Sequence, residues 1–306
     1  MSTDTASTIR NVLQRECPGV HVTSVRPLDK GYTSKQWVAA TDEGRLLVKV
    51  PQRDLDPEHL RRLVAGARVA AEHGIPVVRY RRLVPHEPAV NGPLLIQEYQ
   101  EGEAAGDVWD SLDGDQRMVL LQDLGDIIGR LHAIVGPHFG DVLGGARASS
   151  LRESVEAEVA ALLPQAELGR IGDPDTLRSA IGAAVARLEN SANVPAFTHG
   201  DLWLPNFLVR NGRISCVLDF EHATYAERFR DFGKLDEHIF DAFPAGRDVF
   251  LKSYDAACPL PDDWERRVDL GHLLHALNMH VYFLRWSPQW APQYAQQAKK
   301  WLASNS

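Results

Sequence analysis

The chain has 306 residues, of which 44% are hydrophobic, and this is enough to bury a large core or to fold as two lobes. Its formal net charge of −8 argues against a nucleic acid or an anionic membrane as partner, and no apolar run nears the roughly 18 residues of a membrane-spanning helix. The N-terminus lacks the apolar core of a signal peptide, and the three cysteines form no C-x-x-C pair. We therefore expect a cytoplasmic globular protein with reduced thiols.

Residues 1–100 alternate between apolar runs and polar turns. A helical turn over Ile9–Gln14 and antiparallel strands are expected, the strands over Val20–Leu28, Gln36–Thr41, Leu46–Val50, Val77–Val84 and Leu94–Gln97. In the turn between the first two strands, Gly31 would let the backbone approach a phosphate group. Thr33 and Ser34 offer hydroxyl and amide donors to the same group. An ordinary hairpin turn explains these residues equally well.

Lys49 is a charged residue inside the apolar strand segment LLVKV. A lysine there either has an anionic partner, such as a phosphate, or lies on the open face of the strand. The next helix should follow the N-cap Asp56, begin at Pro57 and end near Gly74. In protein kinases a glutamate on this helix pairs with the strand lysine. Glu58, in the first turn, is the candidate for that role here.

A polar break follows the expected sheet, at Gln97–Gly102, and suits a hinge between two lobes. We place a nucleotide-binding lobe at 1–100 and a catalytic and acceptor-binding lobe at 101–306. The second lobe should be mostly helical. Apolar stripes predict one long helix after Asp113 and further helices over Leu151–Leu163, Thr176–Leu188, Ala226–Phe240, Trp264–Trp286 and Tyr294–Leu302.

The stretch His199–Glu221, HGDLWLPNFLVRNGRISCVLDFE, carries the chemistry. Asn211-Gly212 joins two short apolar runs, which predicts a hairpin because both residues accept the positive φ of a type I′ turn. The hairpin would return Asp219 to the loop that contains Asp201 and Asn206. Two carboxylates and one amide oxygen would then lie on one small surface.

This set of oxygen atoms suits phosphoryl transfer. Asn206 and Asp219 can hold Mg²⁺, which takes few protein ligands, and Asp201 is left to orient a hydroxyl and accept its proton. Protein kinases place these roles on H-R-D-L-x-x-x-N and D-F-G. The chain keeps that register, with Gly200 in place of the arginine and Glu221 in place of the last glycine. A hairpin with incidental acids in its turns does not explain why motif and context agree.

The chain resembles the aminoglycoside phosphotransferase family, the kinase-like group that also includes choline and fructosamine kinases. The segments FTHGDLWLPNFLV and ISCVLDFEHATYAERFRDFGKL carry the resemblance, with support from LLVKV, GIPVV, LIQEY and IIGRLHAI. It implies an α+β, bilobal protein-kinase-like fold, with an antiparallel sheet in the small N-terminal lobe and a larger, mostly helical C-terminal lobe. It also implies ATP or GTP, Mg²⁺, and phosphoryl transfer to a hydroxyl of a small molecule.

The resemblance further implies a role for individual residues. Asp201 would be the base, Asn206 and Asp219 the metal ligands, and Lys49 a ligand of the α and β phosphates. Backbone groups of Gln97 and Tyr99 would contact the nucleotide base. Asp231 would brace the catalytic loop through backbone amides, and His199 would support the same loop.

Three functions compete: an antibiotic or aminocyclitol kinase, a metabolic kinase for a small alcohol or sugar, and a kinase-shaped binding protein without turnover. A protein kinase is disfavoured, because only 12 positions separate Asp219 from Asp231 and leave little room for an activation loop. The complete set of Asp201, Asn206, Asp219 and Lys49 disfavours the binding protein. A monomer or a homodimer is expected.

The acceptor should lie near Trp203 and acids that follow the catalytic hairpin, namely Glu221, Asp236, Glu237 and Asp241. These acids would attract an amine-bearing, hydroxylated molecule electrostatically. A charged helix surface explains the same acids equally well.

Overall fold

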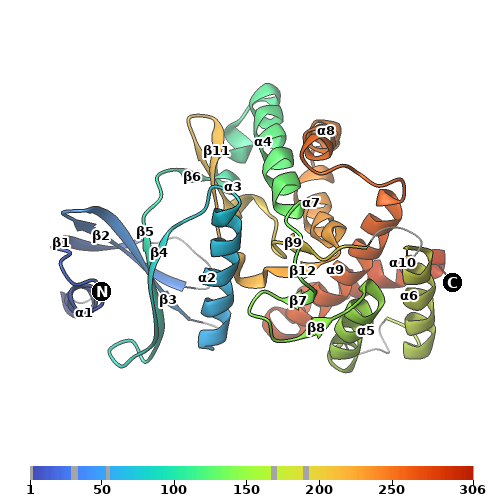
Figure 1. The fold of residues 1–306 in the computed structure, drawn as a ribbon, viewed down its shortest axis with the longest axis horizontal. Coiled ribbons are helices and arrows are strands. Elements are labelled where there is room, and N and C mark those ends of the chain that lie inside the picture. The colour runs from blue at the N-terminus through green and yellow to red at the C-terminus, as the bar shows by residue number, and fades with distance from the viewer. Residues whose placement is uncertain (1–2, 29–33, 53–55, 167–170, 189–192, 306) are drawn as a thin grey trace. The chain divides into compact units, whose positions relative to one another are not determined.

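The computed structural model describes residues 3–28, 34–52, 56–166, 171–188 and 193–305. The chain forms two compact units, each built from two stretches of sequence (Figure 1). The first unit contains Met1–Ala104 and Phe207–His222, and the second contains Ala105–Asn206 and Ala223–Ser306. A division at residue 100 follows chain order, whereas the hairpin after residue 206 belongs with the first unit.

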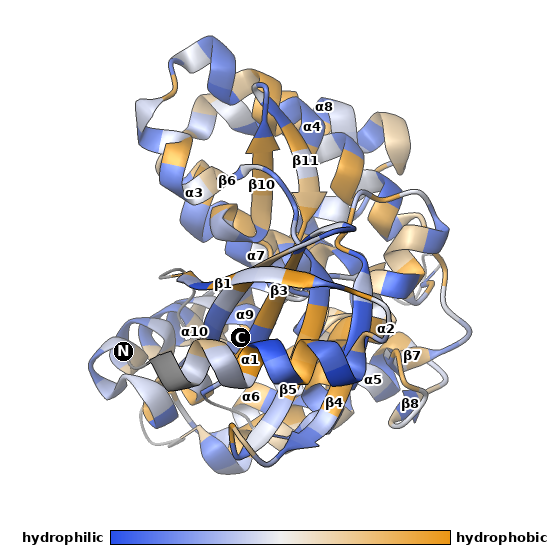
Figure 2. Ribbon diagram, turned by 90° about the vertical axis from the view of Figure 1, so that its left-hand side faces the viewer, coloured by the Kyte–Doolittle hydropathy of each residue, from blue (hydrophilic) through white to orange (hydrophobic). Residues whose placement is uncertain are grey.

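The first unit contains a five-stranded antiparallel sheet. Its strands, in spatial order, are β1 (Val22–Leu28), β2 (Ser34–Thr41), β3 (Gly44–Pro51), β5 (Gly92–Glu98) and β4 (Tyr80–Glu87). The helix α1 (Thr3–Glu16) lies across one face of this sheet (Figure 2). It is longer than the expected turn, because Ile9, Val12 and Leu13 form an apolar stripe that is buried against the sheet.

The helix α2 (Pro57–Glu72) begins and ends where its caps predict. The Asp56 side chain accepts a hydrogen bond of 2.9 Å from the Glu58 N–H, and Gly74 follows the helix with a φ of 72°. The buried stripe contains Leu60, Leu63, Gly66, Ala67 and Ala70. A stripe over Leu60, Leu63, Val64, Ala67 and Ala71 is expected from the apolar spacing, and the structure buries Leu60, Leu63 and Ala67 of it, whereas Ala71 is exposed.

The predicted hairpin consists of β10 (Phe207–Arg210) and β11 (Arg213–Val217). Positive φ angles at Asn211, 55°, and Gly212, 71°, confirm the tight turn between them. In the first unit β10 also pairs with β6 (Glu103–Ala104), and the Val217 N–H donates to the Pro76 carbonyl at 2.7 Å. These backbone bonds explain why the hairpin is part of the first unit.

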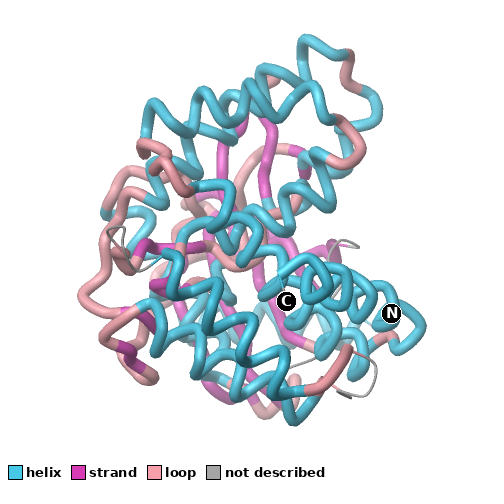
Figure 3. The backbone as a smooth tube through the Cα atoms, turned by 90° about the vertical axis from the view of Figure 1, so that its right-hand side faces the viewer, coloured by secondary structure: helices cyan, strands magenta, loops and turns pink. Residues whose placement is uncertain are grey.

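The second unit is mostly helical (Figure 3). Its α-helices are α3 (Ala105–Val108), α4 (Gly114–His132), α5 (Leu151–Leu162), α6 (Pro174–Leu188), α7 (Phe232–Leu235), α8 (Arg247–Ala257), α9 (Trp264–Trp286) and α10 (Ala291–Asn305). A small sheet accompanies them, with the order β8 (Arg147–Ala148), β7 (Phe139–Asp141), β12 (Thr224–Ala226) and β9 (Ala196–Thr198). The sheet of the first unit and the helices of the second confirm the α+β class. None of the described helices is long and apolar enough to cross a bilayer.

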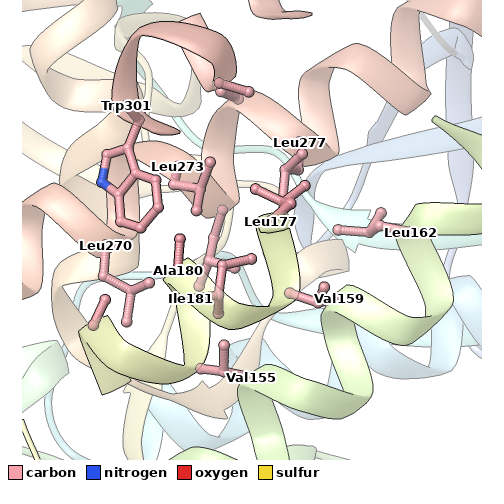
Figure 4. Packing of buried hydrophobic residues seen from close by; sticks show 14 of the residues in the cluster. Val155, Val159, Leu162, Leu177, Ala180, Ile181, Leu270, Leu273, Leu277 and Trp301 are labelled. Atoms are coloured by element: carbon pink, nitrogen blue, oxygen red, sulfur yellow. The ribbon is translucent and has the colours of Figure 1, made fainter. Parts of the chain in front are cut away.

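The core of the second unit lies between α5, α6, α9 and α10 (Figure 4). Val155, Ile181, Leu273 and Trp301 contribute to it from these four helices. Full burial of one such side chain stabilises a fold by about 1.5–3 kcal/mol, so this cluster fixes α9 firmly in the unit. The helix α9 in turn supports the segment that follows β12.

That segment corrects one expectation. The single helix predicted over Ala226–Phe240 is instead a strand residue followed by three short helical pieces: η6 (Arg228–Asp231), α7, and the π-helical turn η7 (Asp236–Phe240). The helical hydrogen bonding changes type along the segment, and the Asp241 N–H donates to the Asp236 carbonyl five positions earlier, at 2.8 Å, in the π-helical turn. The segment also packs closely on α9, since a Cβ at Gly233 would lie 2.7 Å from the His275 Cβ.

Candidate active site

The loop after β9 holds Asp201 through Asn206. The Asn206 Nδ2 donates hydrogen bonds to the Asp201 backbone carbonyl at 2.9 Å and to its carboxylate Oδ2 at 2.8 Å. Asn206 is only 5% exposed, so both contacts are protected from water. Because the amide nitrogen faces Asp201, the amide oxygen is the atom left to bind a cation.

Asp231 supports the beginning of the same loop from η6. Its Oδ2 accepts the His199 N–H and its Oδ1 accepts the Gly200 N–H, both at 2.8 Å. The His132 Nε2 lies 3.1 Å from Oδ2, and the Asp231 side chain is almost fully buried. Asp231 therefore fixes the backbone immediately before Asp201. His132, on α4, is a part of this site that the sequence motifs did not single out, although it lies in the segment IIGRLHAI.

Burial alone would raise the pKa of the Asp231 carboxyl. The hydrogen bonds that Asp231 accepts from the His132 side chain and from the His199 N–H oppose burial and lower its pKa. Burial lowers the pKa of His132 in spite of its contact with Asp231. A neutral His132 that donates from Nε2 to Asp231 can accept from the Tyr254 hydroxyl at Nδ1, 3.0 Å away. All polar atoms of this buried group are then paired.

Lys234 is a contact of Asp201 that the sequence interpretation missed. Its Nζ donates a hydrogen bond to the Asp201 Oδ1 and lies 5.2 Å from the centre of the Trp203 ring. The residue lies on α7, three positions after Asp231, so one helical turn separates the two. That spacing is the only signal in the sequence that links Lys234 to the catalytic loop.

In the first unit, Lys49 on β3 pairs with Asp219. The Lys49 Nζ lies 2.8 Å from the Asp219 Oδ1. Asp219 follows β11 with a φ of 56°, a left-handed conformation that aspartate tolerates better than most residues. The strand lysine therefore has an anionic partner, but this partner is the acid of the LDFE motif.

Glu58 does not contact Lys49 in the structure. Its side chain is about half exposed and pairs with Arg61 one turn further along α2. The neighbouring residue His59 is instead the one that faces the hairpin, with its Nε2 3.1 Å from the Glu221 carboxylate. The physical reason is position: a residue in the first turn of α2, on its solvent side, cannot reach the strand.

The structure describes three of the five other residues expected around the nucleotide, namely Ser34, Gln97 and Tyr99. Gly31 and Thr33 lie outside the described residues, and Ser34 begins β2. Gln97 is buried on β5. The Tyr99 N–H donates to the Arg45 carbonyl at 2.9 Å, so a nucleotide base would have to replace this bond to use that donor.

The acids expected at the acceptor site have basic or hydrogen-bonding partners. Asp236 accepts from Arg247 at 3.0 and 3.2 Å and from His272 at 2.8 Å. Glu237 accepts from His275 at 2.7 Å and from the Tyr294 hydroxyl at 2.6 Å. These contacts offset much of the negative charge that the sequence suggested.

Of the other three expected acceptor residues, Asp241 and Trp203 lie in the second unit and Glu221 lies in the first. Asp241 is exposed, and its N–H donates to the Asp236 carbonyl at 2.8 Å. Trp203 lies in the catalytic loop, with its ring centre 5.9 Å from that of His238. Burial lowers the pKa of His238, which favours its neutral form beside Trp203.

The donor set is compatible with magnesium. Among the described residues, no group of three or more histidine, cysteine or acidic side chains is arranged to hold a metal ion by itself. Mg²⁺ needs no such cage, since it binds through one or two carboxylates together with water and substrate phosphates.

The three cysteines, Cys17, Cys216 and Cys258, all lie in the described part of the chain and form no disulfide bonds.

A substitution tests the lysine. We expect Lys49→Met to weaken nucleotide binding by about tenfold or more, because a charge-assisted hydrogen bond contributes about 1.5–3 kcal/mol. Glu58→Ala, which removes a half-exposed acid, should leave the affinity unchanged. Calorimetric titration with the magnesium nucleotide measures both variants. An equal loss in Glu58→Ala would restore that residue as the partner of Lys49.

Comparison with known proteins shows which family and which solved structures the chain resembles. The model of the phosphotransferase enzyme family matches residues 24–270. Among curated proteins, no sequence matches the chain. Solved structures are similar over nearly the whole chain. A putative fructosamine-3-kinase from Thermobifida fusca YX-ER1 has a TM-score of 0.69 at 19% identity, and the match covers 95% of this chain and 99% of that one.

Two further structures contain ligands. The GDP and kanamycin complex of APH(2″)-IIIa matches with a TM-score of 0.65 at 16% identity, over 97% of this chain and 99% of that one. The streptomycin–ATP ternary complex of APH(2″)-IIa matches with a TM-score of 0.65 at 17% identity, over 95% of each chain. At these identities the likeness establishes a shared fold.

Proposed function

The chain belongs to the phosphotransferase enzyme family, and on this premise we propose that it transfers the γ-phosphate of ATP or GTP to a hydroxyl of an amine-bearing antibiotic or aminocyclitol. The observation that carries the proposal is the arrangement around Asp201. One carboxylate oxygen is held by Asn206, and the backbone just before it is held by Asp231. A carboxylate fixed in this way can orient a hydroxyl and accept its proton, which is what phosphoryl transfer requires of the protein.

The reaction assigns each residue a task. The acceptor oxygen forms a bond to the γ-phosphorus while the bond from that phosphorus to the bridging oxygen breaks, and the hydroxyl proton moves to the Asp201 carboxylate. Lys49 binds the α and β phosphates. Asn206 and Asp219 are the proposed ligands of Mg²⁺, which neutralises charge on phosphate oxygens when it is bound.

The nucleotide part of the proposal rests on the resemblance and on two similar proteins. One of them is named with GDP and the other with ATP, so both nucleotides remain candidates here. We propose that Gly31, Thr33 and Ser34 contact phosphates and that Gln97 and Tyr99 contact the base. If Tyr99 contacts the base through its N–H, that N–H must leave the Arg45 carbonyl.

The acceptor is the finer part of the proposal. Kanamycin and streptomycin are named with two of the similar proteins, which supports an amine-bearing antibiotic. The partners of Asp236 and Glu237 weaken the electrostatic argument for such a molecule, so we propose Trp203, Glu221 and Asp241 as its contacts. Glu221 would exchange its pairing with His59 for the acceptor. A metabolic kinase for a sugar, fructosamine or choline-like alcohol is the alternative, and the fructosamine-3-kinase likeness favours it. We also propose a cytoplasmic monomer or homodimer.

A screen of acceptors decides between the two. Release of nucleoside diphosphate is measured with aminoglycosides, peptide antibiotics, nucleosides, choline and sugars, at low and high salt, with Asp201→Asn as the blank. An amine-bearing acceptor should turn over fastest, with a KM that rises with salt because attraction between charges is screened. Faster turnover of neutral polyols, with no salt dependence of KM, would favour the metabolic kinase.

A further inference from the structure

Asp201 is held at both carboxylate oxygens. The amide of Asn206 donates to Oδ2 at 2.8 Å, and the ammonium group of Lys234 donates to Oδ1. Both members of the ion pair are largely buried, with side chains 17% exposed for Lys234 and 18% for Asp201. Such an ion pair is screened less by water than one on the surface. Contacts at both oxygens fix the plane of the carboxylate, whereas a contact at one oxygen leaves it free to rotate.

Lys234 is itself firmly placed. It follows Gly233, whose close approach to His275 seats α7 on α9, and α7 begins directly after the buried Asp231. Its ammonium also lies 5.2 Å from the centre of the Trp203 ring, within the range of a cation–π contact. The nearby acids Asp236 and Glu237 bind other partners, and Lys234 forms its ion pair with Asp201.

We propose that Lys234 is a positioning residue for catalysis, which holds Asp201 in the orientation that receives the acceptor hydroxyl. This proposal rests on the proposed function, in which Asp201 accepts the hydroxyl proton. When the proton arrives and the carboxylate loses its charge, the Trp203 ring continues to hold the ammonium in place.

The role predicts a specific kinetic pattern. Lys234→Met should lower kcat by about tenfold or more, because small errors in the placement of a reacting group cost up to about a hundredfold in rate. The KM for nucleotide should change less than about twofold, because Lys234 is not proposed to contact the nucleotide. Lys234→Arg keeps a cationic donor to the carboxylate and should recover part of the lost kcat. Lys252→Met, which removes an exposed lysine from α8, is the matched control and should behave as wild type.

The experiment uses the full chain with the best acceptor from the screen and, in parallel, the slow hydrolysis of nucleotide, in which water is the acceptor. A wild-type kcat in Lys234→Met would overturn the proposal. A second result would also overturn it. If Lys234→Arg has the same low kcat as Lys234→Met and both variants lose the same thermal stability, the contact is only structural.

A crystal structure of Lys234→Met gives a readout without activity. The Asp201 carboxylate should rotate away from its wild-type plane while the backbone held by Asp231 stays in place. An unmoved carboxylate would contradict the positioning role. Failure of the proposed function is recognised separately, because in that case Asp201→Asn would turn over as fast as the wild type whatever Lys234 does.

Discussion

Asp201→Asn is expected to lower kcat by about 10²–10⁴-fold, the range that a positioned general base contributes. The new NH₂ group faces a donor, either Asn206 or Lys234, but the loop backbone stays held by Asp231, so the loop should keep its conformation. The amide cannot accept the acceptor proton, and its charge no longer matches Lys234. The affinity for magnesium nucleotide should stay close to that of the wild type, because the proposed nucleotide contacts come from other residues. Steady-state kinetics and calorimetry on the same preparation measure both quantities.

Asp219→Asn is the matched comparison. It should lower the affinity for magnesium nucleotide by about tenfold or more, because the amide oxygen lacks the full negative charge that binds Mg²⁺ and pairs with Lys49. Asparagine is preferred to alanine at this position, because the φ of 56° is left-handed and asparagine tolerates it without added strain. Wild-type turnover in Asp201→Asn would remove Asp201 as the base. Unchanged nucleotide affinity in Asp219→Asn would remove Asp219 from the metal site.

Features set by local rules were predictable from the sequence. The Asn211-Gly212 turn and the Asp56 cap depend on a few neighbouring residues, and each is where the sequence placed it. The choice of glycine at position 200 also follows from a local rule. The φ of 78° at Gly200 turns its N–H toward Asp231, and few side chains accept that angle, which explains a glycine where protein kinases have arginine.

Partners that are distant in sequence were not predictable. Lys49 and Asp219 are 170 positions apart, and the expectation of a helix glutamate came from analogy with kinases instead of from any pattern in the chain. The charge of Asp236 was visible in the sequence, but the side chains that donate to it, Arg247 and His272, lie on α8 and α9. A count of acids therefore overestimates the negative charge, because it omits the cations that folding brings beside them.

The second large effect is expected at Asp231. Asp231→Asn should destabilise the protein by about 3 kcal/mol at neutral pH, because removing one member of a buried, charged hydrogen-bond group leaves its partners unpaired. The carboxylate accepts from His199, Gly200 and His132. An amide can accept at only one atom, and its NH₂ group would face a donor. The loop before Asp201 should loosen, so kcat should fall as well.

The pH dependence follows from the lowered pKa of Asp231. A carboxyl whose pKa is lower in the folded than in the unfolded protein adds stability above its unfolded pKa, about 3.9, and loses it as pH falls through the folded value. The gap in free energy of unfolding between wild type and Asp231→Asn should therefore be full at pH 7 and shrink below about pH 4. Urea unfolding from pH 7 down to pH 3 measures this gap.

Asp126→Asn is the control, at an exposed position on α4 where the acid pairs with Arg130. It should change stability by less than about 0.5 kcal/mol. A gap that is equally small for both variants at pH 7 would show that Asp231 does not hold the catalytic loop.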